Sequence, residues 1–141
     1  MADRLGLDEA RIVVETILRE AEKRGLKFAA AVVDPGGELI YLARMNGASP
    51  LNARMSVNKA YTATKWQRDT RAIKERLFAM TLGDERREIS WFCDPMYTPV
   101  WGGILLKSKD GAILGALGES GGTAEQDEEI GQIGAKAFSE L

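Results

Sequence analysis

The stretch GALGESGGTAEQDEEI, residues Gly115–Ile130, decides the fold because it joins the last apolar strand pattern to the last amphipathic helix pattern. Glycine adopts backbone angles that are forbidden to other residues, so Gly121 and Gly122 predict a tight turn between the two elements. Thr123 is a favoured helix N-cap, and Gln126 three residues later completes a capping box. We therefore expect a strand, a glycine turn and a helix that caps its own first turn.

A glycine turn followed by a helix can also bind a phosphate through free backbone N–H groups. Four carboxylates oppose an anion here, because they lie in the first turns of the helix: Glu125, Asp127, Glu128 and Glu129. The chain also lacks the glycine-rich GxGxxG and Walker patterns of nucleotide-binding loops. We expect the helix to satisfy its own N–H groups.

The remaining chain has the periodicities of further helices and hairpins. Helix patterns cover Asp8–Arg24, Pro50–Trp66, a short segment from Thr70 to Phe78, and the closing helix from Thr123 to Phe138. Strand patterns cover Phe28–Val33, Glu38–Met45, Val100–Lys107 and Ala112–Gly118, and a fifth strand is expected near Glu88–Phe92. Neighbouring strands are joined by hairpins rather than crossovers, so residues 1–141 predict one α+β domain with an antiparallel sheet of about five strands.

Composition limits the function classes. The chain has 141 residues, which suits one domain with a core of its own, and its net charge is −2. Such a charge gives no field for nucleic acid or an anionic membrane, so neither is expected as a partner. Cys93 is the single cysteine, and we find neither a signal-peptide pattern nor a membrane span. The expected location is the cytoplasm.

The chain contains no histidine. This excludes a Ser-His-Asp triad, a Cys-His pair and an imidazole metal ligand. With Cys93 alone, we expect no metal site within one chain. Proton transfer would then depend on Asp, Glu, Lys, Tyr or Cys93.

Four motifs occur in an order that resembles one known family. They are AVVDPGGEL at 31–39, RMNGA at 44–48, NKAYTA at 58–63, and GALGESGGTAEQD at 115–127. The chain is similar to the GlcG/HbpS family, which includes a glycolate-utilisation protein, a haem-binding protein, the C-terminal domain of PduO-type proteins and a hydroxylaminobenzoate lyase. The resemblance implies a profilin-like antiparallel sheet flanked by helices and a homo-oligomer, a dimer or larger.

Haem is the cofactor that this resemblance raises. Some family members are thought to hold haem through a histidine, which this chain lacks. The residues able to ligate iron instead are Met45, Met55, Met96, Cys93, Tyr61 and Tyr97. Methionine is more often a filler of the core. We expect no certain cofactor, and the absence of histidine disfavours haem.

Lys59 and Glu119 are the catalytic candidates. A partly buried lysine loses affinity for its proton and can act as a base or nucleophile, whereas an ordinary helix lysine is solvated. Glu119 replaces the small apolar residue that the family's usual pattern has before Ser120. A desolvated carboxyl can act as an acid or base, and the alternative is an exposed strand end.

The ligand-binding candidates are Arg44, Tyr61, Thr62, Ser120, Trp91, Tyr97 and Trp101. Arg44 ends a strand, where its planar guanidinium could clamp a carboxylate or form a salt bridge. The aromatic residues predict either a pocket for a flat organic ligand or a subunit interface.

Three classes of function follow. The first is a protein that binds a small organic molecule in a pocket near a subunit interface, including haem without a histidine ligand. The second is a cofactor-independent lyase, isomerase or hydrolase acting on a small aromatic or hydroxy acid. The third is an oligomeric scaffold. The first two require Lys59, Arg44 and Glu119 to converge on one cavity.

Overall fold

A computed structural model describes residues 2–141 and contains four strands and four α-helices in that range. The strands are β1 (Ala29–Val33), β2 (Leu39–Arg44), β3 (Gly103–Lys107) and β4 (Ile113–Ser120). The helices are α1 (Leu7–Lys23), α2 (Pro50–Trp66), α3 (Thr70–Phe78) and α4 (Ala124–Ser139). The strands form one antiparallel sheet in the order β2-β1-β4-β3, which confirms the predicted α+β class.

The predicted fifth strand is wrong, and the sheet has four strands within residues 2–141. The segment Ile89–Phe92 forms a 3-10 helix, η2, directly after another, η1 (Glu85–Arg87). Local turns satisfy its backbone, because the N–H of Trp91 donates to Glu88 and the N–H of Cys93 donates to Ser90. The segment Ile89–Phe92 therefore forms local turns, although its apolar composition predicted a strand.

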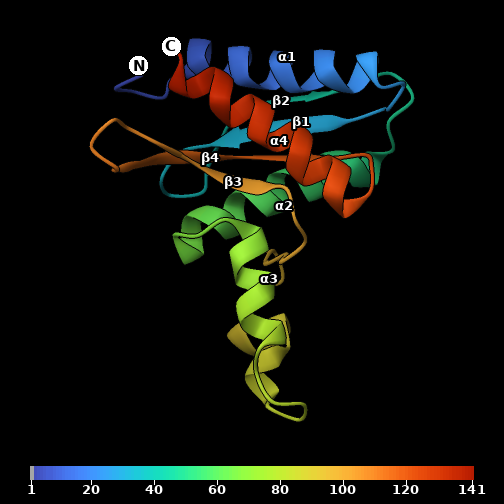
Figure 1. The fold of residues 1–141 in the computed structure, drawn as a ribbon, viewed down its shortest axis with the longest axis vertical. Helices are drawn as coiled ribbons and strands as arrows, with labels where there is room; N and C mark the ends of the chain where they lie inside the picture. The colour runs from blue at the N-terminus through green and yellow to red at the C-terminus, as the bar shows by residue number, and fades with distance from the viewer. Residues whose placement is uncertain (1) are drawn as a thin grey trace.

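Helices cover both faces of the sheet (Figure 1). On one face α1 and α4 enclose a core that includes Val13, Ile17, Phe28, Leu117 and Phe138. On the other face α2 packs through small side chains on β1, β3 and β4, with a core of Val33, Ala60, Ala63, Leu105 and Ala116. Every residue of the inner strand β1 is consequently buried.

Close approach between α2 and the sheet depends on glycine. A Cβ at Gly118 would overlap the backbone oxygen of Ser56, and a Cβ at Gly103 would overlap the backbone oxygen of Lys59. These glycines allow the turn of α2 that carries Lys59 to pack directly against β3 and β4. Lys59, one of the two predicted catalytic residues, therefore lies in the protein interior.

The segment of α3, η1 and η2 projects away from the sheet (Figure 1). We call residues 70–99 the arm. Within residues 2–141, no helix combines the length and the apolar character that crossing a bilayer requires. Over the same range, no group of three or more His, Cys, Asp or Glu side chains is arranged to hold a metal ion.

Candidate functional site

The start of α4 satisfies its own backbone, which confirms the prediction of a self-capped helix. The Thr123 hydroxyl accepts from the N–H of Gln126 at 3.2 Å, and Gln126 Oε1 accepts from the N–H of Thr123 at 2.9 Å. The N–H of Gly122 donates to Asp127 Oδ1 at 2.9 Å. These N–H groups already have acceptors in the chain, so this turn has no phosphate cradle.

Lys59 is buried and joins α2 to both β4 and α4. Its Nζ donates to Asp127 Oδ2 at 2.9 Å and to the backbone oxygen of Glu119 at 2.8 Å. Only 1% of the Lys59 side chain and 5% of the Asp127 side chain is exposed. A buried ammonium is tolerated when it is paired and hydrogen-bonded, so the ion pair explains why lysine is accepted there.

Glu119 lies beside this ion pair and is fully buried. Neither oxygen of its carboxyl has a hydrogen-bond partner among residues 2–141. Burial raises the pKa of Glu119 well above its usual range; the Lys59 ammonium opposes this shift, while Asp127 and Glu128 add to it. The neutral, protonated carboxyl is therefore the favoured form in this position.

Asp127 is affected in the same direction. Burial raises the pKa of Asp127, although Lys59 and the backbone N–H groups of Gly121 and Gly122 oppose the shift. We call Lys59, Glu119 and Asp127 the buried charge cluster. It brings together both predicted catalytic candidates, and it adds a third residue that the sequence analysis treated only as part of the helix start.

Two glycines, Gly102 and Gly131, lie directly beside the Glu119 carboxyl. A Cβ at Gly102 would overlap Glu119 Oε1, and a Cβ at Gly131 would overlap Glu119 Oε2. Gly102 also has a φ of +119°, a conformation that L side chains rarely adopt. The carboxyl thus lies directly behind the backbone of Trp101-Gly102 and the second turn of α4.

A surface depression of about 680 Å³ lies in front of this wall. We call it the Trp101 depression; its lining residues are Arg71, Trp101, Glu125, Glu128, Glu129 and Gln132. Two of these lining residues each have a buried polar atom without a hydrogen-bond partner among the described residues, namely Trp101 Nε1 and Glu128 Oε1. The Arg71 guanidinium lies 4.3 Å from the centre of the Trp101 ring. Buried polar atoms are normally paired, so these two atoms mark the depression as a candidate site.

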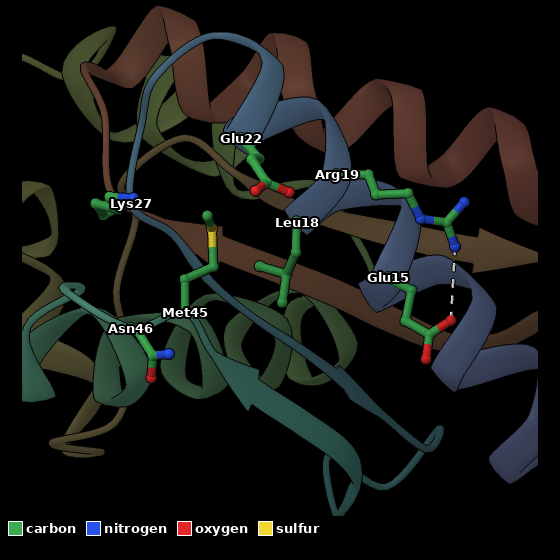
Figure 2. Close-up of a pocket in the computed structure, with 7 residues that line it drawn as sticks. All are labelled: Glu15, Leu18, Arg19, Glu22, Lys27, Met45 and Asn46. Atoms are coloured by element: carbon green, nitrogen blue, oxygen red, sulfur yellow. Dashed lines mark ion pairs between the residues drawn. The ribbon is translucent and has the colours of Figure 1, made fainter.

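A second depression, of about 460 Å³, lies between α1 and the segment after β2 (Figure 2). Leu18 and Met45 provide its apolar part, and Glu15 pairs with Arg19 at its rim. None of its lining residues carries a buried, unpaired side-chain N or O atom. This depression consequently gives no comparable signal for a ligand.

Arg44 does not join the buried charge cluster. It is exposed at the end of β2 and lines a third depression with Leu42, Leu51 and Arg54, among others. Ser120 is also directed elsewhere, because its hydroxyl donates to Asn52 Oδ1 at 3.3 Å. The expected convergence of Lys59, Arg44 and Glu119 on one cavity therefore does not occur within the chain.

The other aromatic candidates fasten the arm to α2. The Trp66 ring lies 4.6 Å from the Phe92 ring and 5.8 Å from the Tyr97 ring. The Tyr61 hydroxyl donates to Asp94 Oδ2 at 2.7 Å. We call Tyr61, Trp66, Phe92, Asp94 and Tyr97 the arm anchor.

Two further ligand-binding candidates, Thr62 and Trp91, belong to the arm or to its attachment. Thr62 belongs to its attachment, since its hydroxyl accepts from the N–H of Thr98 at 2.8 Å. Trp91 is half exposed on the arm. Trp101 is thus the aromatic candidate that lines the depression beside the buried charge cluster.

None of the described residues able to ligate haem iron lines the Trp101 depression. The hydrogen bond to Asp94 and burial raise the pKa of Tyr61 to about 12, which disfavours a phenolate ligand. Met45 Sδ already accepts from the N–H of Phe28 at 3.3 Å, and Cys93 is exposed on the arm. The remaining candidates line none of the three depressions described above: Met55, Met96 and Tyr97.

Sequence reasoning missed three residues of this region. Asp127 was interpreted as a favourable charge at the helix start, although its i, i+4 neighbour Gly131 already indicated an inward face. Glu128 carried a similar signal, because Gly131, three residues later on the same face of α4, is buried. Arg71 gave no signal, since its contact with Trp101 joins segments 30 residues apart.

Comparison with known proteins gives one family match and several relatives. The model of the family described as "Haem degrading protein HbpS-like" matches residues 5–136. Protein GlcG of Escherichia coli K12 is 31% identical over 111 residues, which is 79% of this chain and 77% of that protein.

Solved structures show the same fold. The crystal structure of protein ORFY of Klebsiella pneumoniae superposes with a TM-score of 0.87 at 24% identity, covering 100% of this chain and 95% of that one. A double mutant of HbpS from Streptomyces reticuli gives a TM-score of 0.81 at 26% identity, covering 96% and 88%. Both structures therefore share the overall fold of this chain.

Proposed function

The chain belongs to the HbpS-like family of haem degrading proteins, and from that premise we propose that it binds a small organic molecule in the Trp101 depression. The observation that carries the proposal is the pair of buried polar atoms without partners, Trp101 Nε1 and Glu128 Oε1. Both belong to residues that line the same depression. One is a donor and the other is an acceptor.

Unpaired buried polar atoms are costly, at about 1–3 kcal/mol each. A ligand with a complementary donor and acceptor recovers this free energy on binding, whereas a fully paired surface offers no such gain. Binding pockets commonly combine an apolar wall with a few convergent polar groups. The Trp101 ring and these two atoms have that composition.

The buried charge cluster supports the site from behind. Lys59 ties the end of β4 to the start of α4 through two hydrogen bonds. It thereby fixes the helix that carries Glu128. Glu119 lies behind the backbone of Gly102 and Gly131 and does not line the depression. We therefore assign it a role in positioning this backbone. Binding rather than acid–base catalysis is the function that this arrangement supports.

Self-association is the second part of the proposal. The arm exposes large apolar side chains at Phe78, Leu82 and Trp91, with exposed fractions of 60%, 79% and 50%. Several large apolar side chains exposed on one projecting segment favour burial against a partner surface. We expect a homo-oligomer, and light scattering coupled to size exclusion tests it: a strictly monomeric mass would contradict this part alone.

A ligand screen with matched tryptophan variants tests the binding function. The chain has three tryptophans, so Trp101→Phe removes the N–H in the depression while Trp91→Phe makes the same change on the arm. The probes are small organic amines, alcohols and carboxylic acids, together with haemin. Binding is followed by thermal shift and by tryptophan fluorescence, and haemin also by its Soret band.

We expect at least one organic probe to stabilise the wild type and Trp91→Phe, and to bind Trp101→Phe at least about fivefold more weakly. The proposal is wrong if no probe binds, or if every probe that binds is indifferent to Trp101→Phe. A Soret band of unchanged affinity in Trp101→Phe would place haemin outside the Trp101 depression, and the organic probes would then decide the proposed site.

A further inference from the structure

The Trp101 depression has an excess of negative charge. Its lining includes three carboxylates and one cation, Arg71. Two of these charges are already paired, because Glu129 accepts from Arg24 at 3.1 Å and Arg71 donates to Glu75 at 3.2 Å. Glu125 and Glu128 have no cationic partner among residues 2–141. The charges left over are therefore anionic.

Glu128 is the buried member of this pair. Only 7% of the residue is exposed. Its Oε2 accepts from Gln132 Nε2 at 3.0 Å, while Oε1 is buried and has no partner in the described chain. A carboxylate oxygen in this position is best matched by a charged donor, since charge-assisted hydrogen bonds are roughly twice as strong as neutral ones.

Trp101 adds two further requirements. The Arg71 guanidinium already lies 4.3 Å from the centre of the Trp101 ring, so the ring offers an aromatic contact rather than a free cation–π position. Its Nε1–H is a donor only, and it is buried without an acceptor. A ligand that satisfies both residues must therefore carry a cationic donor for Glu128 and an acceptor oxygen for Trp101.

We propose that the Trp101 depression binds small organic amines that carry a hydrogen-bond acceptor, such as amino alcohols and amino ethers. The ammonium group donates to Glu128 Oε1, and the ligand oxygen accepts from Trp101 Nε1. This inference rests on the proposed binding function and specifies its ligand class. Glu125 at the rim adds attraction for the same charge.

Organic anions are the wrong class for this site. Glu125 and Glu128 would repel a carboxylate directly, and Glu129 would do so from its ion pair with Arg24. Arg71 is the one cation of the lining, and its charge is shared between Glu75 and the Trp101 ring. Behind the wall, Lys59 is the one cation of the described chain that pairs with Asp127, and its charge also acts on Glu119.

A matched set of four probes tests the ligand class by calorimetry at pH 7. The amine with an acceptor is 2-phenoxyethylamine. In 3-phenylpropylamine a methylene replaces the ether oxygen, in 2-phenoxyethanol a hydroxyl replaces the ammonium, and phenoxyacetate carries the opposite charge. We expect 2-phenoxyethylamine to bind about tenfold or more tightly than 2-phenoxyethanol or phenoxyacetate, and about threefold or more tightly than 3-phenylpropylamine.

Two variants assign these differences to residues. Glu128→Gln is expected to weaken 2-phenoxyethylamine about tenfold and to leave 2-phenoxyethanol unchanged, whereas Glu22→Gln, the same change at an exposed site on α1, alters neither. Trp101→Phe is expected to abolish the preference for the ether over the methylene. Circular dichroism and the urea midpoint establish that each variant is folded.

The possible failures separate the two proposals. If phenoxyacetate or the alcohol binds best and responds to Trp101→Phe, the amine inference is wrong and the binding function remains. If 2-phenoxyethylamine binds but Glu128→Gln affects it no more than Glu22→Gln, the assignment to this carboxylate is wrong. If none of the four probes binds, the amine class is wrong, and the wider screen then decides the binding function.

Discussion

The buried charge cluster and the arm anchor both join α2 to distant parts of the chain, but they do so in different surroundings. In the cluster, Lys59 meets Asp127 with almost no exposed surface. In the anchor, Tyr61 meets Asp94 at a partly exposed position. The comparison shows that the same kind of polar contact has very different consequences when water is excluded.

Water is the reason for the difference. In the cluster, a group that loses its partner cannot be solvated, so the remaining charge is strongly unfavourable. In the anchor, water can replace a lost hydrogen bond, so the contact contributes only a modest amount. Three predictions test this contrast, and they run from the largest expected effect to the smallest.

Lys59→Met is expected to have the largest effect. It leaves Asp127 buried without its cation, which destabilises the fold by about 3–5 kcal/mol. Adding Asp127→Asn should recover part of the loss, because the second variant removes the stranded charge. The measurement is urea unfolding of the two variants beside Lys136→Met, an exposed lysine on α4 that should change little. A loss below 1 kcal/mol for Lys59→Met would contradict the importance of the ion pair.

Glu119→Gln is expected to change the pH dependence of stability. Burial raises the pKa of Glu119 in the folded protein well above its ordinary value of 4.5, so the folded state binds the proton that the unfolded chain releases. The free energy of unfolding that this proton contributes is fully present below the unfolded-state pKa of about 4.5. It is lost as pH rises through the folded-state pKa, by at most about 1.4 kcal/mol per pH unit.

The amide does not titrate, so Glu119→Gln should flatten this part of the profile. Unfolding free energies at several pH values from 4.5 to 8 measure the difference between variant and wild type. Asp127 and Glu128 are unchanged in the variant, so the two proteins differ only in the Glu119 side chain. Parallel profiles for the two proteins would show that its carboxyl is ionised in the fold.

Tyr61→Phe is expected to have the smallest effect. It removes one partly exposed hydrogen bond to Asp94, which contributes about 0.5–1.5 kcal/mol. The loss should be local, so amide hydrogen exchange should increase in the arm and not in the sheet. Absorbance titration of the wild type supplies a second readout, because one tyrosine should ionise near pH 12. Increased exchange throughout the sheet would mean that the anchor stabilises more than the arm.

Local sequence signals predicted the elements that depend on local chemistry. The helix from Pro50 to Trp66 has the predicted bounds, since Ser49 caps it and proline occupies its first turn. The capping box of Thr123 and Gln126 is formed as predicted. Glu119 was recognised as unusual because a carboxylate stands where the family pattern has an apolar residue.

Contacts between distant segments could not be predicted in the same way. The partner of Lys59 is 68 residues away, and no local pattern relates it to Asp127. Glu119, Glu128 and Trp101 have side-chain atoms without hydrogen-bond partners because no donor or acceptor of the described chain is placed to bond them. Hydrophobic periodicity describes each segment by itself and cannot predict this. Arg44 has the correct residue type for a clamp, but the register of β2 places it at a different depression.

The double hydrogen bond of Lys59 has a mechanical consequence. One ammonium group holds both ends of the glycine turn between β4 and α4, and it belongs to the helix that also carries the arm. Loss of this single ammonium would therefore release the end of β4 and the start of α4 from α2 at the same time.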